Sequence, residues 1–308
     1  MALLFYSLDD DAESWGRELR RHLPDLDYRV WPETGDLAEI DAALVWKPPP
    51  GLLRSLPNLK AILSLAAGVD AMLADPTLPD VPLCRLVDPS LTRTMSEFVL
   101  LQALKYHRGL DVYAGQQRAA RWRLHLPLPP SATTVGIMGL GVLGEDAART
   151  LRGHGFSVRG WSRTEKRLEG IACFSGEAGL DAFLAETRIL VCLLPLTPET
   201  RGILDARLFA RLPKGARLVN VARGAHLVER DLIEALDRGQ LAHASLDVFQ
   251  DEPLPPDHPF WRHPAIDVTP HAASYGLPES AAQLVAENYR RLREGRPLLH
   301  VVDRARGY

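Results

Sequence analysis

The stretch TVGIMGLGVLG, residues Thr134–Gly144, decides the fold that this sequence predicts. Its first five residues, Thr134–Met138, are mostly apolar and predict a buried strand. Three glycines with the spacing G-x-G-x-x-G follow, and the segment Glu145–His154 predicts a helix after them. In this order the glycines allow a tight turn, close approach of a pyrophosphate, and close packing of helix on strand. The stretch therefore predicts a dinucleotide-binding unit in preference to an ordinary glycine turn.

The same turn predicts where the phosphates of the cofactor bind. Free backbone N–H groups at the start of a helix attract phosphate groups. We therefore expect the dinucleotide to contact one short run of residues, namely Gly139, Gly141, Val142, Leu143 and Gly144.

The residues after the next predicted strand, Ser157–Trp161, favour NADP(H) over NAD(H). An acid about 20 residues beyond the glycines normally binds the ribose 2′-hydroxyl. Here the strand is followed by Ser162, Arg163 and Thr164, with Lys166 close behind. An acid would repel a 2′-phosphate, whereas a hydroxyl and a guanidinium can bind one. The alternative is that Arg163 is a solvated surface residue, and NAD(H) is left as a possible cofactor.

Length and composition predict a two-domain globular protein. At roughly 100–200 residues per domain, 308 residues suggest two domains. Hydrophobic residues make up 46% of the chain, enough for a sizeable core. The net charge of −3 arises from interspersed acids and bases, so neither nucleic acid nor a membrane is an expected partner. No apolar stretch is long enough to predict a transmembrane helix.

The cysteines and the first residues favour a cytoplasmic protein. Cys84, Cys173 and Cys192 lie far apart and form no C-x-x-C pair, which is typical of a reducing compartment. The same spacing argues against a structural zinc site, and we predict no metal. Met1–Trp15 has no basic segment followed by an apolar one, so we expect no secretory signal.

Strands and helices alternate in two series, which predicts parallel sheets. The first series has strands at Leu3–Tyr6, Ala43–Trp46 and Ile62–Ser64 and helices at Asp11–Arg21, Asp70–Ala74 and Ser96–Arg108. A polar arm, Gln116–Arg123, and a proline-rich connector, Leu126–Ser131, follow. The second series has strands at Thr134–Met138, Ser157–Trp161, Ile189–Leu194, Arg217–Val221, Ala244–Val248 and Ile266–Thr269, with helices that include Glu145–His154 and Glu229–Arg238.

These elements predict an α/β protein with two Rossmann-like, doubly wound parallel-sheet domains and an active-site cleft between them. A last amphipathic helix, Glu279–Glu294, follows the second series, and we expect it to pack back on the first domain. The predicted substrate-binding domain is 1–97 plus 274–308, and the predicted nucleotide-binding domain is 98–273. The crossings near Ser96 and Ser274 would act as hinges.

Three ionisable residues follow the ends of three successive predicted strands: Arg223, Glu252 and His271. In an open parallel sheet the ligand crevice lies outside the carboxyl ends of the strands. Taken singly, these residues could be a turn residue, a solvated loop acid and a core histidine. Their equivalent positions beside a dinucleotide turn favour a catalytic set.

This set suits the reduction of a 2-keto acid. Arg223 can hold the carboxylate and polarise the carbonyl oxygen. His271 can donate a proton to the alkoxide that hydride transfer creates. Glu252, placed beside the ring, would orient it and favour its protonated form. The nicotinamide carries the redox chemistry, and the protein positions and polarises the substrate.

Several segments resemble the D-isomer-specific 2-hydroxyacid dehydrogenases, and the likeness covers nearly the whole chain. The glycine turn is joined in this by NVARG (Asn220–Gly224), LDVFQDEPLP (Leu246–Pro255) and TPHAAS (Thr269–Ser274). Four more segments are most similar to the glyoxylate/hydroxypyruvate reductase A branch: WSRTEK (Trp161–Lys166), LLPLTPET (Leu193–Thr200), EPLPPDHPFWRHP (Glu252–Pro264) and VDRARGY (Val302–Tyr308).

The resemblance implies NADPH-dependent reduction of glyoxylate to glycolate and of hydroxypyruvate to D-glycerate. It gives Arg223, Glu252 and His271 the roles argued above. It also implies a homodimer formed through the nucleotide domain, with the arm that holds Trp122 reaching into the neighbouring subunit. Lys47 departs from the basic residue that the branch often has there.

Further site residues follow from the resemblance alone. Substrate is expected at Trp46, Ala67, Gly68, Val69 and Arg223, with the N–H groups of Gly68 and Val69 binding its carboxylate. Cofactor is expected also at Leu194, Pro195, Val221, Ala222 and Asp247. Asp247 matches a position near the nicotinamide carboxamide, and the alternative is a structural acid.

Two other functions are left open. A reductase of branched or aromatic 2-keto acids would share the fold and the catalytic set, and pocket residues near Trp46 and Trp122 would distinguish it. A dinucleotide-sensing transcriptional co-regulator would tolerate loss of the catalytic set, and here all three residues are present.

Overall fold

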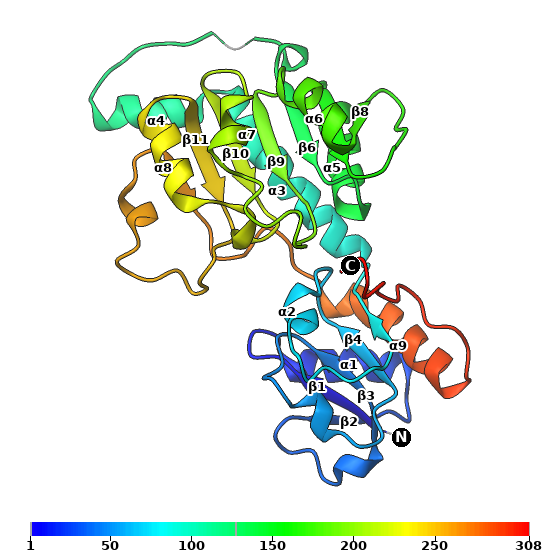
Figure 1. Ribbon diagram of the computed structural model, residues 1–308. Coiled ribbons are helices and arrows are strands. Elements are labelled where there is room, and N and C mark those ends of the chain that lie inside the picture. Colours follow the sequence, from blue (N-terminus) through cyan, green and yellow to red (C-terminus); the bar gives the residue numbers. More distant parts are fainter. Residues whose placement is uncertain (1, 127, 308) are drawn as a thin grey trace. The chain divides into compact units, whose positions relative to one another are not determined.

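The computed structural model describes residues 2–126 and 128–307. It divides the chain into a terminal unit, Met1–Leu91 with Tyr275–Tyr308, and a central unit, Thr92–Ser274. Each unit holds a parallel sheet of its own (Figure 1). The predicted α/β class with two parallel-sheet domains is therefore confirmed.

In its described residues, the terminal unit contains a five-stranded sheet and three complete α-helices. The strands are β1 (Ala2–Tyr6), β2 (Asp27–Val30), β3 (Ile40–Val45), β4 (Ala61–Ser64) and β5 (Leu83–Cys84), and the helices are α1 (Ala12–His22), α2 (Asp70–Leu73) and α9 (Pro278–Arg293). The sheet order is β2-β1-β3-β4-β5. All six residues of β3 are buried, as expected for a central parallel strand. The C-terminal helix α9 packs on α1, and Arg290 donates a hydrogen bond to the carbonyl of His22 at 2.7 Å.

The central unit contains a seven-stranded parallel sheet and most of the helices. Its strands are β6 (Thr134–Met138), β7 (Ser157–Ser162), β8 (Ala172–Ser175), β9 (Ile189–Cys192), β10 (Ala216–Asn220), β11 (Leu241–Leu246) and β12 (Ile266–Val268). Its helices are α4 (Leu110–Arg118), α5 (Val142–Gly153), α6 (Gly176–Leu184), α7 (Ala206–Ala210) and α8 (Glu229–Asp237), and α3 (Pro89–His107) enters it from the terminal unit.

The order of the seven strands, β12-β11-β10-β9-β6-β7-β8, reverses direction at one place. From β6 the chain builds outward through β7 and β8, then returns to the other side of β6 and builds outward from β9 to β12. Ligands of open α/β sheets bind outside the carboxyl ends of the strands at such a switch point. The glycine turn follows β6 and therefore lies at this point.

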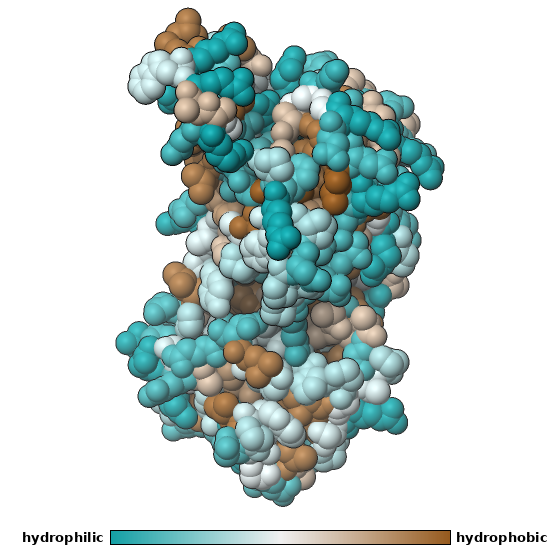
Figure 2. Space-filling model, turned by 90° about the vertical axis from the view of Figure 1, so that its left-hand side faces the viewer, coloured by the Kyte–Doolittle hydropathy of each residue, from teal (hydrophilic) through white to brown (hydrophobic). Residues whose placement is uncertain are grey.

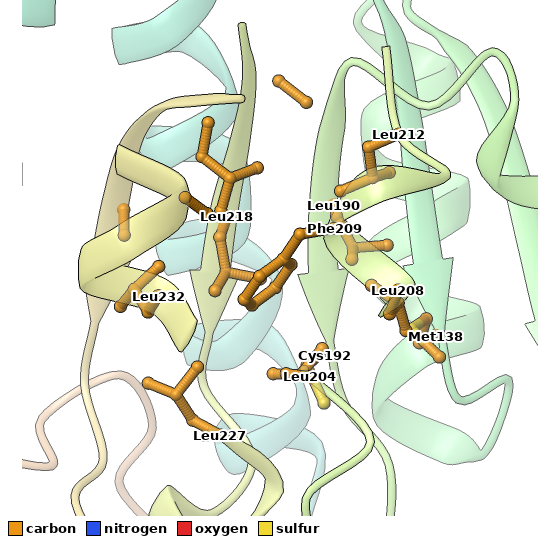
Figure 3. Packing of buried hydrophobic residues seen from close by; sticks show 14 of the residues in the cluster. Met138, Leu190, Cys192, Leu204, Leu208, Phe209, Leu212, Leu218, Leu227 and Leu232 are labelled. Carbon is orange, nitrogen blue, oxygen red and sulfur yellow. The ribbon is translucent and has the colours of Figure 1, made fainter. Parts of the chain in front are cut away.

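A large apolar cluster fixes α7 and α8 against β9 and β10 (Figure 3). Phe209 of α7 is 1% exposed and lies among Leu190 and Leu218 of the sheet and Leu232 of α8. Burying a side chain of this size contributes about 1.5–3 kcal/mol. This packing makes the sheet and its helices a rigid layer, and the functional residues follow the ends of its strands.

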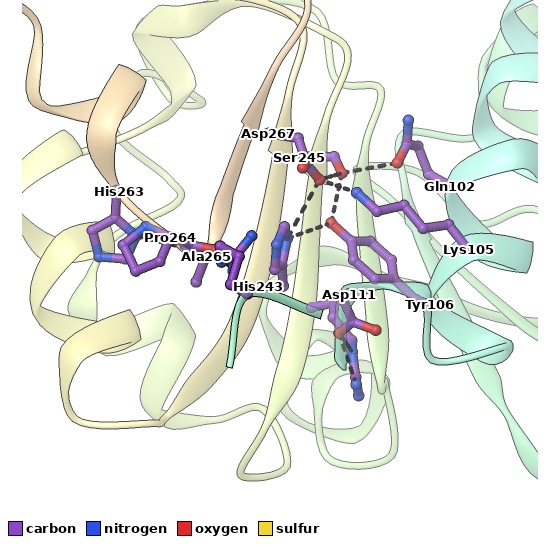
Figure 4. A network of polar contacts seen from close by, with 12 residues as sticks. Gln102, Lys105, Tyr106, Asp111, His243, Ser245, His263, Pro264, Ala265 and Asp267 are labelled. Atoms are coloured by element: carbon purple, nitrogen blue, oxygen red, sulfur yellow. Dashed lines mark hydrogen bonds and ion pairs between the residues drawn. The ribbon is translucent and has the colours of Figure 1, made fainter. Parts of the chain in front are cut away.

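A polar network fixes α3 against the last two strands of the sheet (Figure 4). The Tyr106 hydroxyl lies 2.6 Å from the Ser245 hydroxyl, which donates to the Gln102 side chain at 2.8 Å. Lys105 forms an ion pair with Asp267 of β12. These contacts hold the strand that leads to His271.

Some predicted element boundaries are wrong. The long helix begins at Pro89 rather than Ser96, because the Asp88 carboxylate accepts a hydrogen bond from the N–H of Leu91 at 3.0 Å and proline suits a first helical position. The arm predicted from Gln116 begins inside α4, and α5 begins at Val142 within the glycine motif. The strands β2, β5 and β8 and the helices α4, α6 and α7 were not among the predicted ranges.

Candidate active site

The glycine turn makes the sharp junction between β6 and α5. Gly139 has a φ of +104°, and a Cβ there would lie 2.6 Å from the carbonyl oxygen of Leu193. A Cβ on Gly144 would lie 1.8 Å from the carbonyl oxygen of Gly139. A Cβ on Gly141, by contrast, would meet no atom of the described chain within 4 Å. Two glycines are therefore needed for packing, and the third leaves space above the turn.

The start of α5 is suited to an anion. Gly141 is the N-cap residue, and within the described residues no side chain caps this helix. The first N–H groups of a helix lack partners inside it, and they favour phosphate. Val142 is 44% exposed, while Leu143 is half-buried. The turn therefore fits the phosphates of a dinucleotide.

The end of β7 presents the residues expected beside the ribose. Ser162 is buried, and its hydroxyl donates to the carbonyl of Thr164 at 2.8 Å. Arg163, Thr164 and Lys166 are exposed. Because the hydroxyl hydrogen of Ser162 is already used, the two cations are the better partners for a 2′-phosphate.

The loop after β9 lies beside the glycine turn, as shown by the approach of Gly139 to Leu193. Leu194 is buried, and the Pro195 carbonyl accepts a hydrogen bond from the Thr200 hydroxyl at 2.7 Å. A hydrogen bond from the side chain of Thr197 lowers the pKa of Glu199, and the charge of Arg163 adds to this effect. The structure thus brings the predicted residues of this loop to the switch point.

Cys192, the last residue of β9, is fully buried. Burial raises the pKa of its thiol to about 12, so the thiol stays protonated near neutral pH. Cys84, Cys173 and Cys192 are all free thiols.

The turn that carries Arg223 is held by the last residue of β10. Asn220 is fully buried, and its side chain donates to the carbonyl of Arg223 at 3.0 Å and accepts from the N–H of Ala222 at 3.3 Å. A Cβ on Gly224 would lie 1.9 Å from the carbonyl carbon of Phe249. The turn after β10 therefore packs directly on the loop after β11.

Glu252 and His271 form a close pair at the ends of neighbouring strands. His271 Nδ1 lies 2.9 Å from Glu252 Oε2. The other carboxylate oxygen of Glu252 accepts a hydrogen bond from the N–H of Phe249 at 3.1 Å. Side chains are 32% exposed for His271 and 24% for Glu252. The pair is fixed on one side and reachable from solvent, and it leaves Nε2 of His271 outside the contact.

Asp247, predicted to bind cofactor, is tied into the loop that carries His271. It is 1% exposed. Its carboxylate accepts hydrogen bonds from the Thr269 hydroxyl at 2.6 Å and from the N–H groups of Ala272 and Ala273 at 2.9 Å. These contacts support the structural-acid alternative for this residue.

The predicted substrate residues other than Arg223 lie in the terminal unit. Trp46 follows β3, and Lys47 Nζ lies 5.2 Å from the centre of its ring. Ala67 and Gly68 are half-buried in the loop after β4, while Val69 is buried at the start of α2. They share the carboxyl edge of the five-stranded sheet.

Four residues that the sequence did not single out hold this site in place: Asn220, Gly224, His226 and Thr269. The buried His226 lies 3.2 Å from the carbonyls of both Arg223 and Pro195 and so links two loops at the sheet edge. An asparagine at a strand end can hydrogen bond its own backbone, which was the available signal for Asn220. Pro195, which His226 contacts, and Asp247, which Thr269 contacts, lie too far along the chain to be read from spacing.

Within the described residues, no group of three or more His, Cys, Asp or Glu is arranged to hold a metal ion. Over residues 2–126 and 128–307, no helix is long and apolar enough to cross a membrane.

Comparison with known proteins places the geometry in a family. Residues 100–273 match the model of the D-isomer specific 2-hydroxyacid dehydrogenase, NAD binding domain. The chain is 44% identical to a glyoxylate/hydroxypyruvate reductase A of Yersinia enterocolitica and 45% identical to one of Serratia proteamaculans, with 100% of each chain covered.

Solved structures agree. A D-isomer specific 2-hydroxyacid dehydrogenase from Xanthobacter autotrophicus Py2, in complex with NADPH and MES, has a TM-score of 0.96 and 47% identity, covering 100% of this chain and 99% of that one. An NADPH-dependent glyoxylate/hydroxypyruvate reductase from Sinorhizobium meliloti, in complex with NADP and sulfate, has a TM-score of 0.93 and 42% identity, covering 100% of both. With its switch-point turn and its paired glutamate and histidine, the chain belongs to the D-isomer specific 2-hydroxyacid dehydrogenase family.

Proposed function

We propose that this protein reduces small 2-keto acids with NADPH, converting glyoxylate to glycolate and hydroxypyruvate to D-glycerate. The observation that carries the proposal is the 2.9 Å contact between His271 and Glu252 at the carboxyl edge of a sheet whose switch point holds the glycine turn. The relatives named glyoxylate/hydroxypyruvate reductase A, similar over their whole length, support this choice of substrates.

The central unit would hold the dinucleotide. We assign its phosphates to the N–H groups at the start of α5 and its 2′-phosphate to Arg163 and Lys166. Leu194, Pro195, Val221 and Ala222 follow β9 and β10, the first two strands beyond β6 on one side of the switch point, and would line the nicotinamide half. Bound NADPH would supply the hydride.

The three residues at the ends of β10, β11 and β12 would act on the keto acid. Arg223 presents a planar fork of donors that can bind a carboxylate and draw charge from the carbonyl oxygen. His271, held through Nδ1 by Glu252, would donate a proton from Nε2 to the product oxygen. Glu252 keeps the ring in one orientation through its 2.9 Å contact with Nδ1.

The terminal unit would supply the remaining contacts to the substrate. We assign these to Trp46, Ala67, Gly68 and Val69, at the carboxyl edge of the five-stranded sheet. The N–H groups of Gly68 and Val69 suit a carboxylate, because successive backbone N–H groups can donate hydrogen bonds to one anion. In this proposal the domain 1–97 with 274–308 binds the substrate, and the domain 98–273 binds the cofactor.

We further propose a homodimer that works in the cytoplasm. The support for a dimer is a set of exposed apolar residues on α3, α4 and the segment after them: Leu101, Leu104, Leu110, Val112, Trp122, Leu124, Leu126 and Leu128. Figure 2 shows apolar side chains, in brown, among hydrophilic ones on one face of the molecule. Large apolar side chains exposed on consecutive segments of the chain, as these eight are, are typical of an interface. The three free cysteines suit a reducing compartment, and cell fractionation would test the location.

The substrate proposal predicts a ranked response to a panel of keto acids. NADPH oxidation should be fast with glyoxylate and hydroxypyruvate, and slow with pyruvate and phenylpyruvate. NADH should be the poorer reductant throughout. Preference for phenylpyruvate would support the proposed reaction but contradict the proposed substrates. If no acid is reduced, the proposed activity is wrong, and the protein would be a dinucleotide-binding protein without it.

The 2′-phosphate assignment predicts that Arg163→Ala weakens NADPH binding selectively. Loss of one charge-assisted contact should raise the Kd for NADPH about tenfold and leave the Kd for NADH near its original value. Nucleotide fluorescence measures both constants. Arg163→Lys, which keeps the charge, serves as the matched control and should lose less; equal losses for both nucleotides would remove Arg163 from the site.

The role of Arg223 predicts that Arg223→Lys lowers kcat/KM for the keto acid by about a hundredfold. Lysine keeps the charge but not the fork of donors that a carboxylate and a carbonyl require. The Kd for NADPH should change little. Arg207→Lys, on a residue whose side chain is 94% exposed, controls for the exchange itself. Wild-type turnover by Arg223→Lys would refute the role.

The proposed interface predicts that the double variant Leu101→Glu with Leu104→Glu dissociates. Charged side chains on the exposed face of α3 would have to be buried between subunits, which is unfavourable. Sedimentation velocity should show a dimer for the wild type and a monomer for the variant. Leu8→Glu, at an 85% exposed position of the terminal unit, should stay dimeric. A monomeric wild type would end the dimer proposal.

A further inference from the structure

The carboxyl end of β5 carries an arginine whose charge is not paired within the described chain. Arg85 is the residue directly after this strand, and it is half-buried. Within residues 2–126 and 128–307, its guanidinium makes no hydrogen bond and no ion pair. Burial lowers the pKa of Arg85 below its usual value, because the charged form is held away from water. A buried charge is unfavourable unless it is paired, so this position is suited to an anion from outside the chain.

The C-terminal segment brings a histidine to the same place. The N–H of Arg85 donates to the carbonyl of His300 at 3.1 Å, and the N–H of Val302 donates to the carbonyl of Leu83 at 2.8 Å. The segment therefore runs antiparallel along the edge strand β5. Burial and the charge of Arg85 lower the pKa of His300, and among the described residues Arg85 is the one charged group that shifts it. Two basic groups thus lie close together, and in this part of the chain no acid compensates them.

Neighbouring contacts fix His300 on both sides. Asn288 of α9 is 3% exposed, and its side chain accepts from the N–H of Leu299 at 2.7 Å and donates to the carbonyl of the same residue at 3.2 Å. Arg304, further along the segment, donates to the carbonyl of Pro79 at 2.7 Å. His300 itself has a φ of +55°, in the left-handed region that a residue with a Cβ rarely adopts. Such a conformation persists where its surroundings determine it, and it is found at sites that hold ligands.

We propose that Arg85 and His300 form a binding site for a phosphate group, either free phosphate or the phosphate of a small monoester. The guanidinium offers a planar fork of donors that matches the oxygens of a phosphate. The imidazole adds a second positive charge once it is protonated, and both of its nitrogens are then donors. Two positive charges match a phosphate, which carries about −1.5 to −2 at pH 7, better than they match a carboxylate. The site lies wholly in the terminal unit and does not rest on the proposed function.

A carboxylate is the alternative ligand, because the site adjoins the loop assigned to the substrate. The N–H of Leu86, the residue after Arg85, donates to the carbonyl of Ala66 at 2.9 Å. A carboxylate carries a single charge, which the fork of Arg85 alone can satisfy. A phosphate needs the second charge as well, so its binding should be coupled to protonation of His300. At equal concentration, acetate should therefore bind far more weakly than phosphate.

The ring of His300 reports on this site alone. Phosphate also suits the start of α5 and Arg163, so a measurement on the whole protein, such as Tm, would mix the sites. In proton–carbon NMR spectra of protein with labelled histidines, His300→Asn identifies the signal by its loss, and asparagine tolerates a positive φ. We expect inorganic phosphate, at constant ionic strength, to shift this signal saturably. It should also raise the pKa of His300, since a bound anion favours the charged ring.

Matched variants test whether this binding depends on Arg85. Arg85→Gln should raise the Kd for phosphate at His300 about tenfold or more, through loss of charge-assisted hydrogen bonds. Arg85→Lys, which keeps the charge but not the fork, should lie between Arg85→Gln and the wild type. Arg54→Gln removes the same charge from an exposed position of the same unit, and it should leave the Kd within about twofold of wild type. We expect Arg85→Gln to fold, because it removes an unpaired, half-buried charge.

Glycerol 3-phosphate and acetate complete the comparison. A lower Kd for glycerol 3-phosphate than for inorganic phosphate would indicate a phosphorylated metabolite as the ligand, and an equal or higher Kd would indicate free phosphate. Acetate should give no saturable shift. The proposal is wrong if phosphate gives no saturable shift in the wild type, if Arg85→Gln binds phosphate as tightly as Arg54→Gln, or if acetate binds as tightly as phosphate.

Discussion

Close contact between backbones at the carboxyl edge of the seven-stranded sheet is the constraint on which the site depends. Gly139 packs on the loop after β9, and Gly224 packs on the loop after β11, each at distances that leave no room for a Cβ. Loops that touch through their backbones cannot move independently. His226 also links the loop after β9 to the Arg223 turn. The glycine turn, the Arg223 turn and the Glu252 loop are therefore parts of one layer, although they lie far apart in the sequence.

Much of this layer could be predicted from the sequence, because local signals determine it. The strand, the three glycines and the following helix are contiguous, so their order alone indicated the turn. Arg223, Glu252 and His271 could be grouped because parallel strands end on the same edge of a sheet. The start of α3 was wrong for an equally local reason, since Ser96 lies within the helix and the capping acid, Asp88, lies before it.

The remaining features depend on contacts between segments that are far apart in the sequence. The spacing of residues along the chain does not indicate such contacts. β8 is short and partly exposed at the edge of the sheet, so its pattern of apolar residues is weak. His226 is one of ten histidines, and only the fold brings its ring to the Pro195 carbonyl. The left-handed conformation of His271 could not be predicted either. Glycine is the usual residue at positions with a positive φ, and histidine adopts this conformation only rarely.

The residues assigned to the reaction differ in burial from the residues that hold them in place. The residues assigned to chemistry are partly exposed, as their contact with a ligand requires, while those that hold them are buried: Asn220 under Arg223, and Asp247 under His271. Buried polar groups are costly unless all their hydrogen bonds are made, so each of these residues fixes several backbone groups at once. A change at either would therefore disturb the backbone that carries the neighbouring site residue.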